Sequence, residues 1–140
     1  MNTLKSKNDG ENVISFSRDK TRILFIDDEE LFVHMESRLL ESHGYQVIFK
    51  TRGAEALKLF RSHPGEFDLV ITSQTLPEIT GVELARKLSE IRPDIPIILC
   101  TACSQISEQE AYNNGIQKIM LKPLDSVTLA WTIQRMIDGK

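Results

Sequence analysis

Carboxylates, hydroxyls and one lysine stand at the ends of apolar runs in this chain. The pair Asp27-Asp28 follows one run, Ser73 and Thr101 follow two others, and Lys122 follows a fourth. Carboxylates held side by side repel one another, and such pairs are tolerated mainly where a cation or a lysine compensates them. Oxygen ligands of this kind suit a hard divalent ion such as Mg²⁺. If the ends of these runs meet in space, the residues predict a divalent-cation site.

The acidic residues also fit a simpler interpretation. Asp28, Glu29 and Glu30 stand at the start of a segment of helical period, and the positive N-terminal end of a helix favours carboxylates. Taken alone, the acidic run is therefore equally compatible with a metal site and with an ordinary helix start.

Five short apolar runs alternate with longer segments of helical period. This alternation is typical of a parallel sheet covered by helices on both faces. We therefore predict an α/β fold with five βα units in a doubly wound parallel sheet. Ligands of such sheets bind beyond the carboxyl ends of the strands, which is where the residues named above stand. The expected strands are Arg22–Ile26, Tyr45–Phe49, Asp68–Thr72, Pro96–Cys100 and Lys118–Leu121.

Capping residues mark the ends of the helices between these runs. Gly44 stands where a left-handed residue would end the first helix, and Asp125 is the expected N-cap of the last. Thr80 with Glu83 makes a capping box for the third helix. The second helix is expected over residues 53–62.

Apolar stripes predict which faces of the helices are buried. The fourth helix, expected between a capping box at Ser107 and Gly115, has little apolar stripe, so it should be short and loosely held. The other predicted buried stripes are Leu31, Phe32, Met35 and Leu39 on the first helix, Leu84, Ala85, Leu88 and Ile91 on the third, and Leu129, Ile133, Met136 and Ile137 on the last.

Length and composition indicate one ordinary domain. The chain has 140 residues, of which 41% are hydrophobic and 26% are charged, so a single core can form without disulfides or structural metal. Residues 1–20 are polar and mostly aperiodic, which predicts a flexible leader or interdomain linker before a domain at residues 21–140.

Charge and hydropathy argue against several classes of protein. The 17 basic residues are outnumbered by 20 acidic ones and form no basic run of the length that nucleic-acid binding needs. No apolar stretch reaches the length of roughly 18 residues that marks a membrane span. The first residues have no apolar core of a secretory signal, so the cytoplasm is the expected compartment.

The cysteines and glycines give little support to an enzyme. Cys100 and Cys103 have the C-x-x-C spacing of a redox dithiol or half a zinc site, but no second pair completes four zinc ligands. Cys100 closes an apolar run, where a small buried residue is the simpler explanation. Glycine-rich phosphate loops are absent, which weakens a flavin or dinucleotide interpretation.

With these motifs the chain resembles the receiver domain of two-component response regulators, of the chemotaxis type, over residues 22–137. The segments around the third and fourth strands are similar to receivers fused to sensor histidine kinases. The resemblance implies a flavodoxin-like strand order of 2-1-3-4-5. It rests on Ile26-Asp27-Asp28-Glu29, on Asp68–Thr72 followed by Leu76-Pro77-Glu78-Ile79-Thr80-Gly81, on Thr101-Ala102 and on Lys122-Pro123.

The resemblance also implies roles for the site residues. Asp27 and Asp28 would hold Mg²⁺, with the backbone carbonyl of Thr75 as a further ligand. Thr101 would sense a phosphoryl group through its hydroxyl, and Lys122 would neutralise it. The bond between this lysine and the following proline is usually cis in the family.

Two residues depart from the family pattern. Ser73 occupies the position of the aspartate that accepts phosphate from a phosphohistidine. A serine hydroxyl must lose a proton before it can attack, and no histidine lies nearby in sequence to take it. Loss of that carboxylate also predicts weak or absent Mg²⁺ binding. Ile119 occupies the position of the aromatic switch residue, although ordinary packing also explains an isoleucine there.

We therefore expect a non-enzymatic pseudo-receiver in a two-component phosphorelay, one that is not phosphorylated at Ser73 and acts as a protein-interaction module. The expected partner is a sensor histidine kinase or another phosphorelay protein. The alternative is a competent receiver that uses Ser73 or a nearby acid. A flavin or dithiol oxidoreductase that uses Cys100 and Cys103 is a more distant alternative.

The last helix carries the expected partner surface. Trp131 lies about 200° around the helical wheel from Leu129 and Ile133, and Val127 lies one turn before it on the same side. Large exposed aromatics are frequent at interfaces, so these two residues predict a partner or homodimer contact. A tryptophan packed flat over the edge of the fourth helix is the structural alternative.

Overall fold

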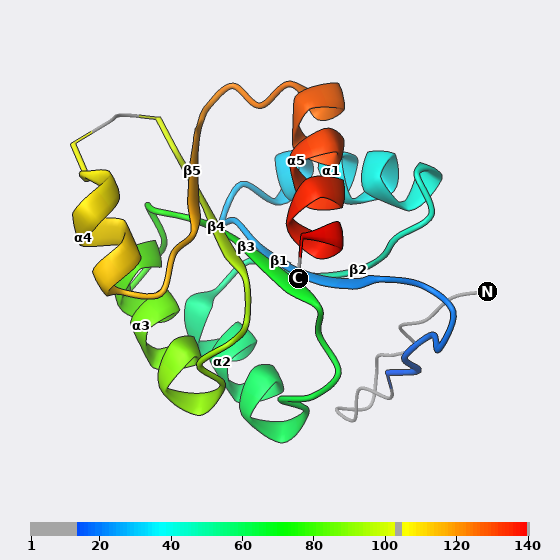
Figure 1. Cartoon of the computed structure of the whole chain (residues 1–140), viewed down its shortest axis with the longest axis horizontal. Coiled ribbons are helices and arrows are strands. Elements are labelled where there is room, and N and C mark those ends of the chain that lie inside the picture. The colour runs from blue at the N-terminus through cyan, green and yellow to red at the C-terminus, as the bar shows by residue number, and fades with distance from the viewer. Residues whose placement is uncertain (1–13, 103–104, 140) are drawn as a thin grey trace.

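The computed structural model describes residues 14–102 and 105–139. Its five strands form one parallel sheet in the order β2-β1-β3-β4-β5 (Figure 1), so the predicted fold class and strand order are confirmed. Three strands are shifted by one residue towards the C-terminus relative to the prediction. The strands are β1 (Arg22–Ile26), β2 (Gln46–Lys50), β3 (Leu69–Ser73), β4 (Ile97–Thr101) and β5 (Lys118–Leu121).

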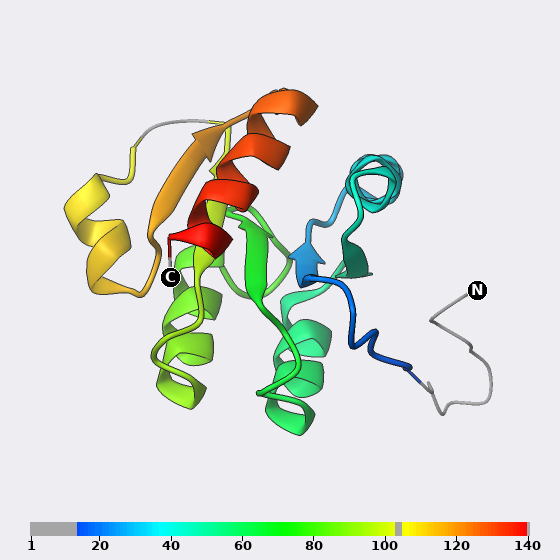
Figure 2. The ribbon, with the colours of Figure 1, turned by 45° about the vertical axis from the view of Figure 1, so that its right-hand side comes forward.

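Helices cover both faces of the sheet (Figure 2). One face packs against α1 (Glu30–Ser42) and α5 (Ser126–Asp138), and the other against α2 (Gly53–Ser62), α3 (Gly81–Ile91) and α4 (Glu108–Asn113). Side chains of β1 alternate between the two faces: Leu24 and Ile26 belong to the core beneath α2 and α3, and Ile23 and Phe25 to the core beneath α1 and α5. This alternation with a period of two is what a strand buried on both faces requires.

The caps predicted at Thr80, Asp125 and Gly44 are present, and of the capping box predicted at Ser107 the structure gives the bond from the Glu110 N–H to the Ser107 hydroxyl. The Thr80 side chain accepts a hydrogen bond from the Glu83 N–H, and the Glu83 carboxylate accepts one from the Thr80 N–H, each at 3.1 Å. Asp125 accepts from the Val127 N–H, and Gly44 has a φ of 97°, in the left-handed region that favours glycine. Helix α4 has only six residues and buries only Ala111, as its weak stripe predicted.

The stripe predicted for α1 is wrong for three of its four residues, since only Phe32 packs against the core. Leu31 and Met35 are 72% and 54% exposed, and Leu39 is exposed as well. The helix instead buries Val33, Glu36, Ser37 and Leu40. Two apolar stripes exist on this helix, and the sheet and α5 pack against the stripe that also carries a carboxylate and a hydroxyl.

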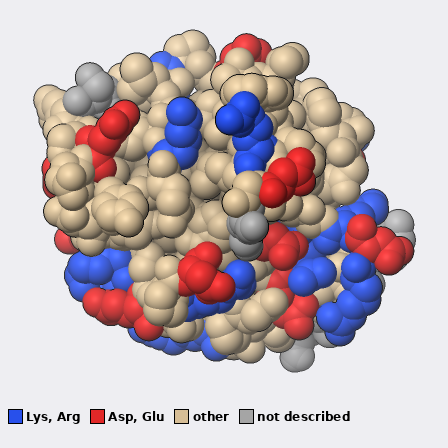
Figure 3. Space-filling model, in the orientation of Figure 1, with Lys and Arg blue, Asp and Glu red and all other residues tan. Residues whose placement is uncertain are grey.

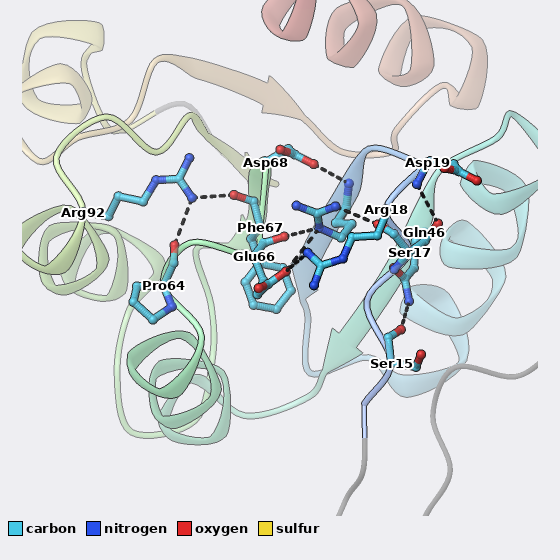
Figure 4. A network of polar contacts seen from close by, with 11 residues as sticks. Ser15, Ser17, Arg18, Asp19, Gln46, Pro64, Glu66, Phe67, Asp68 and Arg92 are labelled. Carbon is cyan, nitrogen blue, oxygen red and sulfur yellow. Dashed lines mark hydrogen bonds and ion pairs between the residues drawn. The ribbon is translucent and has the colours of Figure 1, made fainter.

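Residues 14–20, part of the segment expected to be a leader or linker, lie against the N-terminal end of the sheet (Figure 4). The Gln46 side chain accepts a hydrogen bond from the Ser17 N–H at 2.7 Å and donates one to the Ser15 carbonyl at 2.8 Å. Phe16 packs edge-to-face on Phe67, with ring centroids 5.4 Å apart. Residues 1–13 lie outside the described residues, and the domain boundary at residue 20 stays a prediction.

Charges of both signs are interspersed on the surface. On the face drawn in Figure 3, Lys and Arg side chains alternate with Asp and Glu side chains and leave no continuous basic area. Exposed ion pairs such as Arg52–Glu78 and Arg86–Glu90 join the two signs. Among the residues that the structure describes, no helix combines the length and the apolar character needed to cross a membrane.

Candidate functional site

The carboxyl ends of four neighbouring strands meet at one edge of the sheet. In the parallel register, Ile26 lies opposite Thr72, Ser73 opposite Cys100, and Thr101 opposite Leu121. The residues that end these strands or directly follow them therefore come together, as predicted. They are Asp27, Ser73, Thr101 and Lys122.

Lys122 is the centre of this cluster. Its Nζ donates to Asp27 Oδ2 at 2.8 Å and lies 3.4 Å from Ser73 Oγ. Asp27 is fully buried, and its other oxygen, Oδ1, accepts a hydrogen bond from the Glu29 N–H at 2.9 Å. Both oxygens of Asp27, the one fully buried carboxylate among the residues that the structure describes, are thus already hydrogen-bonded. The peptide bond between Lys122 and Pro123 is cis, as the resemblance implied.

Ser73 and Thr101 are buried residues that line the site. They are 3% and 5% exposed. The Ser73 carbonyl accepts from the Thr72 hydroxyl, and the Thr101 carbonyl accepts from the Lys122 N–H at 2.9 Å. The second of these bonds ties the end of β4 to the residue that follows β5, at the edge where the site lies.

A glycine holds the loop that follows Ser73. The Gly81 N–H donates to the Gln74 carbonyl at 2.9 Å, and the Gln74 side chain accepts from the Val82 N–H at 3.0 Å. A Cβ atom on Gly81 would stand 2.2 Å from the Ser73 carbonyl oxygen. Only glycine therefore allows α3 to begin this close to the end of β3.

Asp28 and Thr75 lie at the exposed rim of the site. A carboxylate pair and a backbone carbonyl are oxygen donors that suit Mg²⁺, which prefers six oxygen ligands and keeps several waters. Of these donors, Asp27 is engaged by Lys122. No cluster of three or more His, Cys, Asp or Glu side chains suited to a metal occurs in the described residues. The donors expected for a divalent ion are therefore two carboxylates, one of them paired with Lys122, and one backbone carbonyl, and binding of the ion by them stays a prediction.

No histidine is placed to act as a base for Ser73. His34, His43 and His63 are all exposed. His34 packs on Phe49 at 5.7 Å, and His43 Nδ1 lies 3.0 Å from the Leu39 carbonyl at the end of α1.

Cys100 has the environment of a structural thiol. Burial, only partly offset by Lys122, raises the pKa of its thiol to about 12. Such a thiol is protonated at neutral pH and is a poor nucleophile. Cys103, the other half of the C-x-x-C spacing, lies outside the described residues.

Two residues near the site were not predicted as functional. The Phe32 ring centroid lies 5.1 Å from Lys122 Nζ. Glu36 is buried between α1 and α5, where its carboxylate accepts from the Ser126 hydroxyl at 3.4 Å. Burial raises the pKa of Glu36, and the bond from Ser126 partly opposes this. The spacing of Glu36 from Val33 and Leu40 was the signal that could have placed it on the buried face.

The residues predicted for switching and for partner contact lie apart from the cluster. Ile119 is partly buried against the core beneath α2 and α3. Val127 and Trp131 are 72% and 59% exposed on α5. The Arg135 guanidinium lies over the Trp131 ring, 4.8 Å from its centroid.

The chain is similar to known signalling proteins over most of its length. It is 31% identical over 119 residues to the aerobic respiration control sensor protein ArcB of Escherichia coli, covering 83% of this chain and 15% of ArcB. A response regulator receiver domain protein from Clostridium thermocellum superposes with a TM-score of 0.80 at 27% identity, covering 85% of this chain and 95% of that one. The CheX–CheY–BeF₃–Mg complex from Borrelia burgdorferi has a TM-score of 0.75 at 21% identity, covering 85% and 88%, and shares the fold.

The family comparison agrees with the geometry of the site. The response regulator receiver domain matches residues 23–134, which spans all five strands from the second residue of β1 and most of α5. The sheet order and the Asp27–Lys122 pair at its carboxyl edge lie within this match. The chain therefore belongs to the receiver domain family of two-component response regulators.

Proposed function

We propose that this chain is a receiver-like regulatory module that is not phosphorylated at the usual site and acts through protein contacts. The observation that carries the proposal is Ser73, which ends β3 with its Oγ 3.4 Å from Lys122 Nζ. The proposal takes Ser73 as the counterpart of the acceptor aspartate of the family. Receiver domains are in general signalling modules without an enzymatic activity of their own.

The surroundings of Ser73 support an inert hydroxyl. To attack a phosphoryl group, the hydroxyl must pass its proton to a base. Both oxygens of Asp27 accept hydrogen bonds from Lys122 and from the Glu29 N–H. The three histidines lie elsewhere on the surface. Within residues 14–102 and 105–139, neither a histidine nor an unpaired Asp27 is therefore available to take the proton.

The proposal includes weak binding of Mg²⁺. Receiver domains bind Mg²⁺ at the phosphorylation site. Asp27, Asp28 and the Thr75 carbonyl would hold the ion here, where its charge would be set against that of Lys122. Two carboxylates instead of three, one of them already paired with a lysine, support a dissociation constant in the millimolar range or weaker.

Receiver domains interact with histidine kinases and other phosphorelay proteins. We infer a partner of this kind for the present chain and, as the contact surface, the exposed Val127 and Trp131 of α5. A homodimer through α5 is the second arrangement that this surface supports. Ile119 has no aromatic ring that could switch position, so the proposed contact does not depend on phosphorylation. The proposed compartment of the protein is the cytoplasm.

Phosphorylation by acetyl phosphate tests the proposal. The parent chain should take up no phosphate with or without Mg²⁺, whereas Ser73→Asp, which supplies an anionic nucleophile and a third carboxylate, should be labelled only with Mg²⁺. Ser73→Ala is the matched control. Labelling of the parent that is lost in Ser73→Ala would show that Ser73 is itself the acceptor, and labelling retained in Ser73→Ala would assign it to a neighbouring acid.

A further inference from the structure

Phe32, in the first turn of α1, has its ring close to the ammonium group of Lys122. The distance from the ring centroid to Nζ is 5.1 Å, within the range in which a cation is attracted to the face of an aromatic ring. The same Nζ contacts Asp27 Oδ2 at 2.8 Å and Ser73 Oγ at 3.4 Å. A carboxylate, a hydroxyl and a ring therefore surround one ammonium group.

The core fixes the Phe32 ring. It packs edge-to-face on Phe25, with centroids 6.5 Å apart and planes at 87°, and Phe25 is fully buried. Phe32 also packs against the core cluster beneath α1 and α5. The contact between ring and lysine is therefore built into the packing of the domain rather than formed by a mobile surface side chain.

Charge at the site balances without a metal. Asp27 is the buried carboxylate of the pair, while Asp28 is exposed to water at the rim. With Ser73 at the end of β3, one ammonium group and one carboxylate make the buried part of the site electrically neutral. A divalent ion that bound Asp27 Oδ2 would have to separate Lys122 from its partner.

We propose that Phe32 is a positioning residue that holds Lys122 on Asp27, so that the lysine ammonium is the resident cation of the site and competes with Mg²⁺. This inference rests on the proposed function, in which Ser73 leaves only two carboxylates. Displacing Lys122 costs its contact with Asp27 and also its contact with the ring. Phe32 therefore lowers the affinity of the site for Mg²⁺.

The test is a titration with MgCl₂ alone, followed by the amide resonances of the site in two-dimensional NMR spectra. Phe32→Leu keeps an apolar side chain but removes the ring face, and it should bind Mg²⁺ about three- to tenfold more tightly than the parent. Phe49→Leu is the matched control, because Phe49 is a partly buried ring of the same core cluster that pairs with His34. It should bind Mg²⁺ as the parent does.

A double-mutant cycle assigns the effect to the lysine. In a Lys122→Met background, Phe32→Leu should leave the Mg²⁺ affinity unchanged. The side-chain Hε resonances of Lys122 should be shifted upfield by the ring in the parent and return to ordinary values in Phe32→Leu. The same spectra report whether each variant is folded, and Phe32→Met serves as the second ring-free variant.

Two outcomes would overturn the inference. In one, Phe32→Leu and Phe32→Met bind Mg²⁺ no more tightly than Phe49→Leu; in the other, the gain persists without Lys122. Phosphorylation of Ser73 in the parent would instead contradict the proposed function and would leave the metal titration unchanged. The two failures are therefore distinguishable.

Discussion

At the scale of single residues, a buried carboxylate and a lysine set the chemistry of the site. Asp27 has no solvent exposure, and the Lys122 side chain that pairs with it is 20% exposed. A buried charge that loses its partner is costly, while exposed charges contribute little. Asp27 and Asp28 are neighbours in sequence, but their substitutions should therefore have different effects.

Asp27→Ala should lower the free energy of unfolding by about 2 kcal/mol in metal-free buffer, because it leaves Lys122 and the Glu29 N–H without their partner. Asp28→Ala should leave it within about 0.5 kcal/mol of the parent or raise it slightly by removing repulsion. Urea unfolding curves measure both values. If Asp28→Ala proves the more destabilising, Lys122 pairs with Asp28 in solution and not with Asp27.

The ion pair could be predicted from the sequence, but the ring beside it could not. The carboxyl ends of parallel strands meet at one edge of the sheet, so residues such as Asp27 and Lys122, which directly follow two of these strands, are expected to lie close together. The contact of Phe32 depends on the rotation of α1 about its axis. The predicted stripe of that helix placed Phe32 on the buried side correctly, but it placed Leu31, Met35 and Leu39 there as well, so it did not give the rotation of the helix.

At the scale of elements, helix α1 buries a face that its sequence pattern did not predict. Leu31 and Met35 suggest one apolar stripe, yet the helix buries Glu36 against α5. Strands and caps were easier to predict, because a short apolar run that is buried on both faces has no face to choose, and a capping pair such as Thr80 with Glu83 leaves one orientation. Helix α1 has apolar residues on two sides, and only its neighbours decide between them.

Glu36→Gln should make the stability of the domain less dependent on pH. Burial raises the pKa of Glu36, so the folded protein holds this proton more tightly than the unfolded chain. The stability that Glu36 contributes is therefore fully present below its ordinary pKa of 4.5 and is lost as the pH rises through the raised value.

Melting temperatures at several pH values test this effect. Glu36→Gln should melt higher than the parent at neutral pH, and the difference should disappear below pH 4.5. The control is Glu41→Gln, an exposed glutamate on the same helix. An equal change in both variants would indicate a general effect of net charge.

The segment at residues 14–20 should contribute to the stability of the sheet. Phe16 is partly buried on Phe67, so Phe16→Ala should lower the free energy of unfolding by about 2 kcal/mol, less than for a fully buried ring. Asp19→Ala, at an exposed position of the same segment, should have little effect. Unchanged stability of Phe16→Ala would show that the segment leaves the domain readily in solution.

At the scale of the whole molecule, the site and the proposed contact surface lie on different parts of the domain. The site lies at the carboxyl edge of the sheet, and Trp131 lies on the outer face of α5 with Arg135 over its ring. Trp131 and Val127 could be predicted as exposed because the buried stripe of α5, which includes Leu129 and Ile133, is continuous and unique.

Trp131→Glu should leave the fold intact and weaken partner binding or self-association by at least about tenfold, since a large exposed aromatic is a frequent centre of binding energy. Sedimentation analysis of the variant, together with binding to a phosphorelay protein, measures this change. Gln134→Glu places the same charge on another exposed position of α5 and should bind as the parent does. Equal behaviour of the two variants would place the interface elsewhere.

The most direct test of the central claim is transfer from a radiolabelled phosphohistidine donor in the presence of Mg²⁺. Label should stay at background level on the parent and reach close to one phosphoryl group per chain on Ser73→Asp, because only the variant has an anionic nucleophile at the end of β3. Stoichiometric label on the parent, mapped to Ser73 or to an acid at the same edge of the sheet, would contradict the claim.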